Sequence, residues 1–212
     1  MSAPETKGIL IESHYLPCIE YLAVITGNDR ILVEYHENYQ KQSYRNRCRI
    51  LTAQGPIELS IPVIKSSGKM KITDVEIDYS QKWVKDHWGA IRSAYGNAPF
   101  FEHYGEYFAY IYERKPRFLV DLNQEFLYLI FKLLQINPSL DTSMEYTRDP
   151  NGKVQDWRSK IHPKKPLKYN PFYKPCNYNQ IFGKKFVDNL SIIDLLFCEG
   201  PSAGQILKKS RP

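Results

Sequence analysis

Two short apolar runs separated by a helical pattern stand near the N-terminus and limit how the chain can fold. Residues 8–12 (GILIE) and 30–35 (RILVEY) are typical of buried strands, and apolar residues recur at helical spacing between positions 18 and 25. Such a compact unit predicts two parallel strands joined by a helix. In folds of this kind ligands lie beyond the C-terminal ends of the strands, so His14 and His36 are expected near one another.

The rest of the chain extends this unit into a single α/β domain. A β-hairpin is predicted from residues 44–52 and 57–64, and a fifth strand from residues 72–79. Helices are expected over residues 82–96, 100–113, 121–135 and 192–197, with Asp121 and Ser191 as N-caps. The sequence thus predicts one domain over residues 1–212, with an N-terminal βαβ unit, a mixed sheet of about five strands, and a helical middle and C-terminal part.

Residues from about 141 to 178 follow neither the helical nor the strand pattern. They are rich in Pro, Lys, Tyr and Asn and show no sustained period. A compact domain seldom carries a long irregular stretch without a functional reason. This stretch is therefore predicted to be an irregular, lid-like segment.

Three arginines alternate with other residues in the run Arg45-Asn46-Arg47-Cys48-Arg49. Alternate residues of a strand share a face, so the three guanidinium groups are expected side by side. The face is either a solvated outer surface or a wall that binds an anion. In the second interpretation the diphosphate of an activated sugar lies against Arg47, with Arg45 or Arg49 beside it.

Composition narrows the choice of partners. The formal net charge is +6, the isoelectric point is about 9.0, and the chain contains 16 Tyr. This charge favours an anionic small-molecule substrate such as a nucleotide sugar, and the tyrosines suit a lined pocket or a core rim. No zinc-finger, KH or RNP signature is present, so nucleic acid is not an expected partner.

The cysteines favour a reduced, cytoplasmic protein. Cys18, Cys48, Cys176 and Cys198 form no CxxC pair and match no metal-binding framework, so no metal site is expected. No signal peptide is visible, and no segment approaches the roughly 20 apolar residues of a membrane span. The sequence indicates neither a particular cofactor nor an oligomeric state.

Two histidines are candidates for acid–base chemistry. His14 lies at a strand-to-helix turn, where it is either a plain surface residue or a catalytic one. His87 lies on the apolar stripe of a helix one turn from Trp83, where it is either a satisfied core histidine or a base. A nucleotidyltransferase of the HIGH type also begins with a strand, a His-bearing loop and a helix, but Leu16 and Pro17 here replace its second histidine.

The chain as a whole resembles the WbqC-like protein family. The motifs that carry the resemblance run in order along nearly the whole chain: His14 to Pro17, Tyr39 to Lys41, Tyr44 to Arg47, Trp83 with His87, Tyr95, Ala98 to Phe101, Asp121 to Asn123, Asn189 to Phe197, and Glu199 with Gly200. The resemblance implies a role in bacterial surface polysaccharide synthesis, O-antigen included, and brings no settled reaction. Many relatives have Gln-Pro where this chain has Ser13-His14.

Together the motifs and the resemblance define a candidate site. The candidate catalytic residues are His87 and His14. The candidate substrate-binding residues are Arg45, Asn46, Arg47, Lys41, Trp83, Asp121 and Asn123. His14, Asn46, Arg47 and His87 are expected to line one pocket.

Two function classes fit these residues. The first is a transferase that adds an acyl or aminoacyl group to a nucleotide-activated or lipid-linked amino sugar, with a histidine as base. The second is a non-catalytic sugar-nucleotide-binding or assembly protein of the same pathway. A deep pocket that gathers Arg, Asn and His favours the first class, whereas a flat outer arginine face favours the second.

Overall fold

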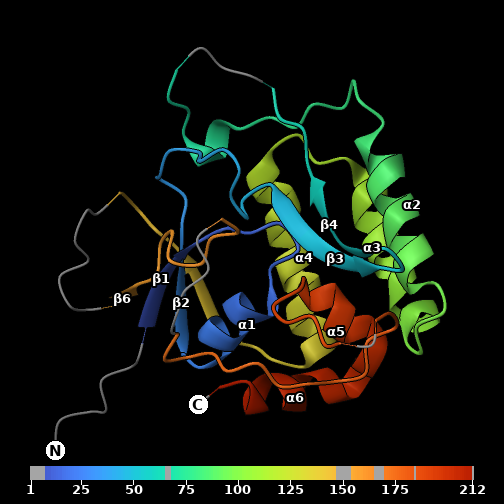
Figure 1. Ribbon diagram of the computed structural model, residues 1–212. Helices are drawn as coiled ribbons and strands as arrows, with labels where there is room; N and C mark the ends of the chain where they lie inside the picture. The colour runs from blue at the N-terminus through green and yellow to red at the C-terminus, as the bar shows by residue number, and fades with distance from the viewer. Residues whose placement is uncertain (1–7, 65–67, 147–153, 165–169, 184, 212) are drawn as a thin grey trace, which may run out of the picture.

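The computed structural model describes residues 8–64, 68–146, 154–164, 170–183 and 185–211 (Figure 1). Strand β1 (Gly8–Glu12) and strand β2 (Arg30–Glu34) pair in parallel, with Gly8 opposite Arg30 and Glu12 opposite Glu34. Helix α1 (Ile19–Thr26) connects them and is buried over most of its length. The predicted βαβ unit is confirmed.

Two further strands complete a four-stranded parallel sheet of order β5-β2-β1-β6. Strand β5 (Ser139–Thr142) pairs with β2, and the two-residue strand β6 (Gln155–Asp156) pairs with β1. The first overlaps the start of the segment predicted to be irregular, and the second lies within it. Residues 147–153 and 165–169 of that segment lie outside the described residues.

The hairpin forms a separate sheet and does not extend the parallel one. Strand β3 (Arg47–Thr52) pairs antiparallel with strand β4 (Gly55–Ser60). The fifth strand expected at residues 72–79 is instead a short 3₁₀ helix, η1 (Ile72–Asp74), followed by isolated bridges. The backbone N–H of Ile77 donates to the carbonyl of Arg117, and that of Asp78 donates to the carbonyl of Pro62. Successive residues thus hydrogen-bond to two different segments, and the stretch forms no continuous strand ladder with either.

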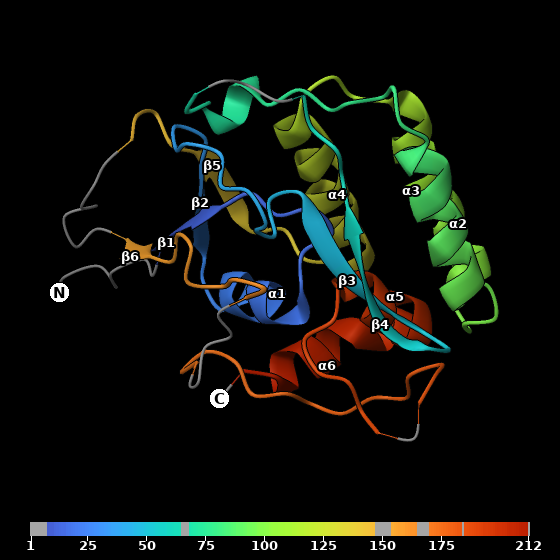
Figure 2. The same cartoon turned by 45° about the horizontal axis from the view of Figure 1, so that its top comes forward.

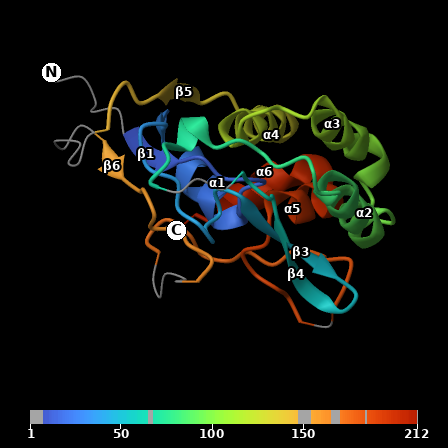
Figure 3. The ribbon, with the colours of Figure 1, turned by 90° about the horizontal axis from the view of Figure 1, so that it is seen from above.

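The middle and the C-terminal part are helical, as expected. The helices are α2 (Trp83–Tyr95), α3 (Phe101–Arg114), α4 (Leu119–Leu134), α5 (Ile192–Glu199), the 3₁₀ helix η2 (Gly200–Ser202) and α6 (Ala203–Lys209). In Figures 2 and 3 the parallel sheet lies at one end of the molecule and α2 and α3 at the other, with α4 between them. No helix in the described ranges has the length and apolarity that crossing a bilayer requires.

Helix α4 contributes nine buried residues to the core and starts earlier than predicted. Its N-cap is Phe118, so Asp121 lies in the first turn and does not cap the helix. An acidic residue there still interacts favourably with the helix dipole. Ser191 likewise makes no side-chain cap, because its hydroxyl donates to the carbonyl of Leu16 at 2.8 Å.

The loops that follow β1 and β2 leave the same edge of the parallel sheet and are tied to each other. The backbone N–H of Tyr15 donates to the carbonyl of Tyr44 at 2.9 Å. Helix α4 supports the second loop, because the Asn123 side-chain amide donates to the carbonyl of Arg45 at 2.8 Å. Polar residues of both loops are thereby held at the C-terminal ends of the strands.

Candidate functional site

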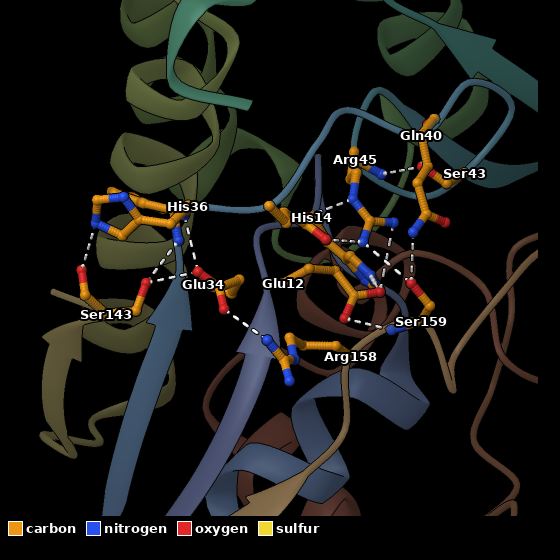
Figure 4. A network of polar contacts seen from close by, with 12 residues as sticks. Glu12, His14, Glu34, His36, Gln40, Ser43, Arg45, Ser143, Arg158 and Ser159 are labelled. Atoms are coloured by element: carbon orange, nitrogen blue, oxygen red, sulfur yellow. Dashed lines mark hydrogen bonds and ion pairs between the residues drawn. The ribbon is translucent and has the colours of Figure 1, made fainter. Parts of the chain in front are cut away.

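A buried polar cluster lies at the C-terminal edge of the parallel sheet (Figure 4). Its members, called the carboxylate–arginine cluster below, are Glu12, His14, Glu34, Glu37, Arg45 and Arg158. Strands β1 and β2 end with Glu12 and Glu34, and both carboxylates are almost completely buried. Ligands of parallel α/β sheets bind outside this edge, so its position marks the cluster as a candidate site.

The first part of the cluster is a paired glutamate and histidine. His14 Nε2 lies 3.2 Å from Glu12 Oε1, and both side chains are buried. An ionised carboxylate only accepts hydrogen bonds, so this contact places the imidazole proton on Nε2. His14 Nδ1 then carries a lone pair, and no hydrogen-bond partner reaches it within the described structure. The ring is held by Tyr21 and Tyr44, at centroid distances of 4.4 and 5.3 Å.

Arg45 is the central cation of the cluster. Its Nε and Nη2 atoms donate to the two carboxylate oxygens of Glu37, each at 2.6 Å. Nη1 lies 3.6 Å from Glu12 Oε1 and has no hydrogen-bond partner among the described residues. The side chain is buried, so its charge can be tolerated only through these carboxylates.

A second ion pair holds the end of β2. Arg158 Nη1 donates to Glu34 Oε2 at 2.8 Å, and the hydroxyl of Ser143 donates to Glu34 Oε1 at 2.7 Å. The ring of His36 turns toward the carbonyl of Ser143, which Nε2 reaches at 3.0 Å. His14 and His36 both lie at this edge of the sheet, but their rings make separate contacts, His14 with Glu12 and His36 with Ser143 (Figure 4).

Residues 155–164, called the cover segment below, lie against the cluster. The backbone N–H of Ser159 donates to Glu12 Oε2 at 2.9 Å, and its hydroxyl accepts from Arg45 Nη2 at 3.2 Å and from Gln40 at 3.0 Å. Trp157 and Ile161 are buried and anchor the segment in the core. Part of the predicted lid-like segment thus packs on the site, although motion of a lid remains a prediction.

The electrostatics favour an ionised glutamate beside a neutral histidine. Burial alone would raise the pKa of Glu12, but the hydrogen bond from His14 and the charge of Arg45 outweigh it and hold this pKa below its ordinary value. Burial lowers the pKa of His14, and Glu12 opposes that shift only in part. A neutral imidazole with an unengaged nitrogen can accept a proton at neutral pH. No three His, Cys, Asp or Glu side chains in the described ranges are grouped to hold a metal ion.

The three alternating arginines do not form one face. Arg45 lies in a turn before β3 and points into the cluster, so the expectation of a three-arginine wall is corrected. Arg47 and Arg49 do share the outer face of β3. There Arg47 Nη1 donates to Glu58 at 2.6 Å, and Arg49 donates to the carbonyl of Asp188 at 2.9 Å. The strand begins at Arg47, and period-two alternation applies only from that residue.

His87 and Trp83 lie in a second, aromatic group. The hydroxyl of Tyr15 donates to His87 Nδ1 at 2.9 Å, and the ring also hydrogen-bonds the backbone of Ser60. The Tyr15 hydroxyl is shared with that of Tyr112. Trp83 packs edge-on against His87 at 5.1 Å. These contacts describe a satisfied core histidine, and a catalytic role for His87 remains a prediction.

The remaining candidates are spread over the fold. Asn46 donates to the carbonyl of Ile61 at 2.8 Å, and Asn123 holds the Arg45 turn. Lys41 is exposed and lines a cavity of about 290 Å³. Asp121 is exposed and lines a different cavity of about 370 Å³. The structure thus places Asn123 and Arg45 at the carboxylate–arginine cluster, while Lys41 and Asp121 line separate surface cavities.

Comparison with known protein families agrees with the motifs seen in the sequence. A profile of the WbqC-like protein family matches residues 12–164 and 163–206. The chain belongs to the WbqC-like protein family. It is also 32% identical over 142 residues to the uncharacterized protein Rv1507c of Mycobacterium tuberculosis, strain ATCC 25618 / H37Rv; the match covers 66% of this chain and 61% of that relative. No solved structure matches.

Four members of the cluster in this WbqC-like chain are not among the site residues predicted from the sequence: Glu12, Glu34, Glu37 and Arg158. A signal was available for the first two, because each is a carboxylate at the C-terminal end of a buried strand. Glu37 and Arg158 both lie in loops, where no local pattern marks them. The partner of Glu37 is Arg45, and Arg158 pairs with Glu34, which lies 124 positions earlier in the chain.

The buried His87 predicts a loss of stability in acid. Burial lowers the pKa of His87 to about 4, against 6.5 for a free histidine. Between pH 4 and pH 6.5 the unfolded chain binds a proton at His87 that the folded chain does not bind. The stability that the neutral His87 contributes is therefore present above pH 6.5 and is lost as the pH falls toward 4. The expected loss between pH 7 and pH 5 is about 2 kcal/mol, measured as the free energy of unfolding in urea. In His87→Gln the free energy of unfolding should lack this loss between pH 7 and pH 5. His103→Gln, which changes an exposed histidine, should show the same dependence on pH as wild type. An equal dependence on pH in all three proteins would contradict the role given to His87.

Proposed function

We propose that the chain is a transferase of bacterial surface polysaccharide synthesis, of the O-antigen type, which acts in the cytoplasm. It would add an acyl or aminoacyl group to the amine of a nucleotide-activated or lipid-linked amino sugar. The WbqC-like family is associated with polysaccharide biosynthesis, which supports the setting. The observation that carries the chemistry is the buried Glu12–His14 pair with an unengaged Nδ1 at the C-terminal edge of the sheet.

In the proposed reaction His14 is the general base. The ammonium group of the sugar first releases one proton to water, and the neutral amine nitrogen then attacks the carbonyl carbon of an acyl thioester and forms the C–N bond. His14 Nδ1 takes a proton from the amine, the C–S bond breaks, and that proton passes to the thiolate, which leaves as the thiol. Glu12 holds the imidazole through Nε2 and stabilises its cationic form during the step.

The charge balance of the carboxylate–arginine cluster supports an amine-bearing substrate. Glu12, Glu34 and Glu37, together with Asp156, which also pairs with Arg158 at 2.7 Å, set four carboxylates against the two guanidinium groups of Arg45 and Arg158. An excess of carboxylate attracts an ammonium group and repels a phosphate at the same place. The diphosphate of the substrate would therefore bind away from the cluster, and of its predicted partners Arg47, with Arg49 beside it on β3, fits that placement. Because His14 Nδ1 is buried, we place substrate access beneath the cover segment.

The test is a transfer assay with the purified chain. UDP-, dTDP- and GDP-linked amino sugars are incubated with acyl-CoA and aminoacyl thioester donors, and products are detected by mass spectrometry. We expect the mass of one sugar to increase by the acyl group, with release of one thiol for each amide formed. Transfer from none of these donors to any amine would count against the enzyme and favour a protein that only binds.

One observation favours that alternative, a non-catalytic sugar-nucleotide-binding or assembly protein. Arg47 and Arg49 share the outer face of β3, where two neighbouring guanidinium groups suit a partner or a bound anion. The two functions differ in a binding experiment. Stabilisation by nucleotide sugars that is lost in Arg47→Ala, without turnover, would support binding alone.

A further inference from the structure

A cavity of about 440 Å³ lies between the N-terminal half of α2 and the C-terminal end of α3. None of its lining residues belongs to the carboxylate–arginine cluster, and the transferase proposal does not use it. Its volume falls within the range of about 300–1,000 Å³ that is typical of small-molecule sites. The two helices lie side by side at the end of the molecule away from the parallel sheet (Figures 1 and 3).

The walls of this cavity are aromatic and held in place. Trp88 stacks on Phe101 at a centroid distance of 5.8 Å and an interplanar angle of 23°. The hydroxyl of Tyr79 donates to the carbonyl of Pro116 at 2.7 Å, which fixes the second ring. Tyr112 is buried and shares its hydroxyl with that of Tyr15. Rings fixed by their own contacts form a preorganised surface on which a planar aromatic ligand can stack.

The rim of the cavity is basic. Lys82, Lys85 and Lys115 line it, against the single carboxylate of Glu113. No ion pair with a described residue engages the ammonium groups of the three lysines. Lys82 and Lys85 also stand at the N-terminal end of α2, where the helix dipole adds positive potential. Asp86 lies in the same first turn of α2 but does not line the cavity, so the cavity combines an apolar aromatic wall with a rim of net positive charge.

We propose that this cavity binds a ligand that joins a planar aromatic ring to a phosphate, which is the chemistry of a nucleotide. The ring would stack on Trp88 and Tyr79, and the phosphates would lie against Lys82, Lys85 and Lys115. The proposal rests on the cavity alone. It stands or falls independently of the acid–base role of His14.

Isothermal titration with UDP, ADP, uridine and pyrophosphate tests both halves of the proposal. We expect at least one nucleotide to bind about ten-fold more tightly than either uridine or pyrophosphate, because only the nucleotide engages ring and cations together. The double variant Lys82→Ala/Lys85→Ala should weaken nucleotide binding about five-fold or more, as expected for the loss of two exposed charge contacts. Quenching of tryptophan fluorescence by the nucleotide should be reduced in Trp88→Phe, which keeps a ring against Phe101.

Two control variants distinguish binding in this cavity from binding elsewhere on the protein. Arg92→Ala removes an exposed cation from the other end of α2 and should leave nucleotide affinity unchanged. Lys132→Ala removes an exposed cation from α4 and should also leave it unchanged, because Lys132 does not line the cavity. The proposal is overturned if neither nucleotide binds more tightly than pyrophosphate, or if the double lysine variant binds as well as wild type.

Discussion

His14→Gln is expected to lower the rate of acyl transfer by about 10²- to 10⁴-fold, the usual contribution of a positioned general base. A glutamine amide can still donate to Glu12, so the fold of the loop should survive, but the side chain cannot take up a proton at neutral pH. The loss should fall mainly on kcat, because the base acts in the chemical step. The measurement is steady-state kinetics on the amino sugar identified by the transfer assay.

The pH profile of the same reaction distinguishes a base from a structural histidine. Burial lowers the pKa of His14, so the acid limb of kcat/KM should fall below pH 6.5. His103→Gln, an exposed histidine on α3, serves as the matched control and should retain wild-type kinetics. If His14→Gln turned over within two-fold of wild type, the proposed base would be wrong even if acyl transfer itself were observed.

The parts of the fold that were predictable are those specified by local pattern. The βαβ unit follows from two apolar runs and one helical stripe within the first 35 residues. Strands β5 and β6 have only four and two residues, and their pairing with β2 and β1 is supplied by tertiary contacts. No single-sequence pattern marks strands this short, so the segment that holds β6 and the end of β5 is predicted to be irregular.

The candidate site also has one part that local sequence pattern predicts and another part that it does not. His14 is predicted because it follows a recognisable strand, and Arg45 because it lies in a run of alternating arginines. The environment of Arg45 is not predictable from the sequence. Side chains alternate between two faces only within a strand, and β3 begins at Arg47, after Arg45. Its partner Glu12 lies 33 positions earlier by residue number, and only the folded chain brings the two together. The chemistry of the cluster thus depends on long-range contacts that a local pattern cannot report.

Arg45→Ala is expected to destabilise the chain by about 3–5 kcal/mol, the usual cost of removing one partner from a buried ion pair. The change leaves Glu37 without its two 2.6 Å bonds and removes the cation that lies 3.6 Å from Glu12. Unpaired carboxylates in a buried site must either be protonated or be exposed to water, and both outcomes cost stability. The measurement is the free energy of unfolding in urea at pH 7.

Arg47→Ala is the matched control, because it removes a neighbouring arginine whose partner, Glu58, is 43% exposed. An exposed pair contributes about 0–1 kcal/mol, so this variant should unfold close to wild type. A second variant distinguishes the cost of leaving a buried carboxylate unpaired from the cost of lost side-chain packing. Arg45→Met/Glu37→Leu removes cation and carboxylate together and should be more stable than Arg45→Ala, because it leaves one fewer carboxylate unpaired. Equal losses in Arg45→Ala and Arg47→Ala would show that the buried guanidinium does not hold this edge of the sheet together.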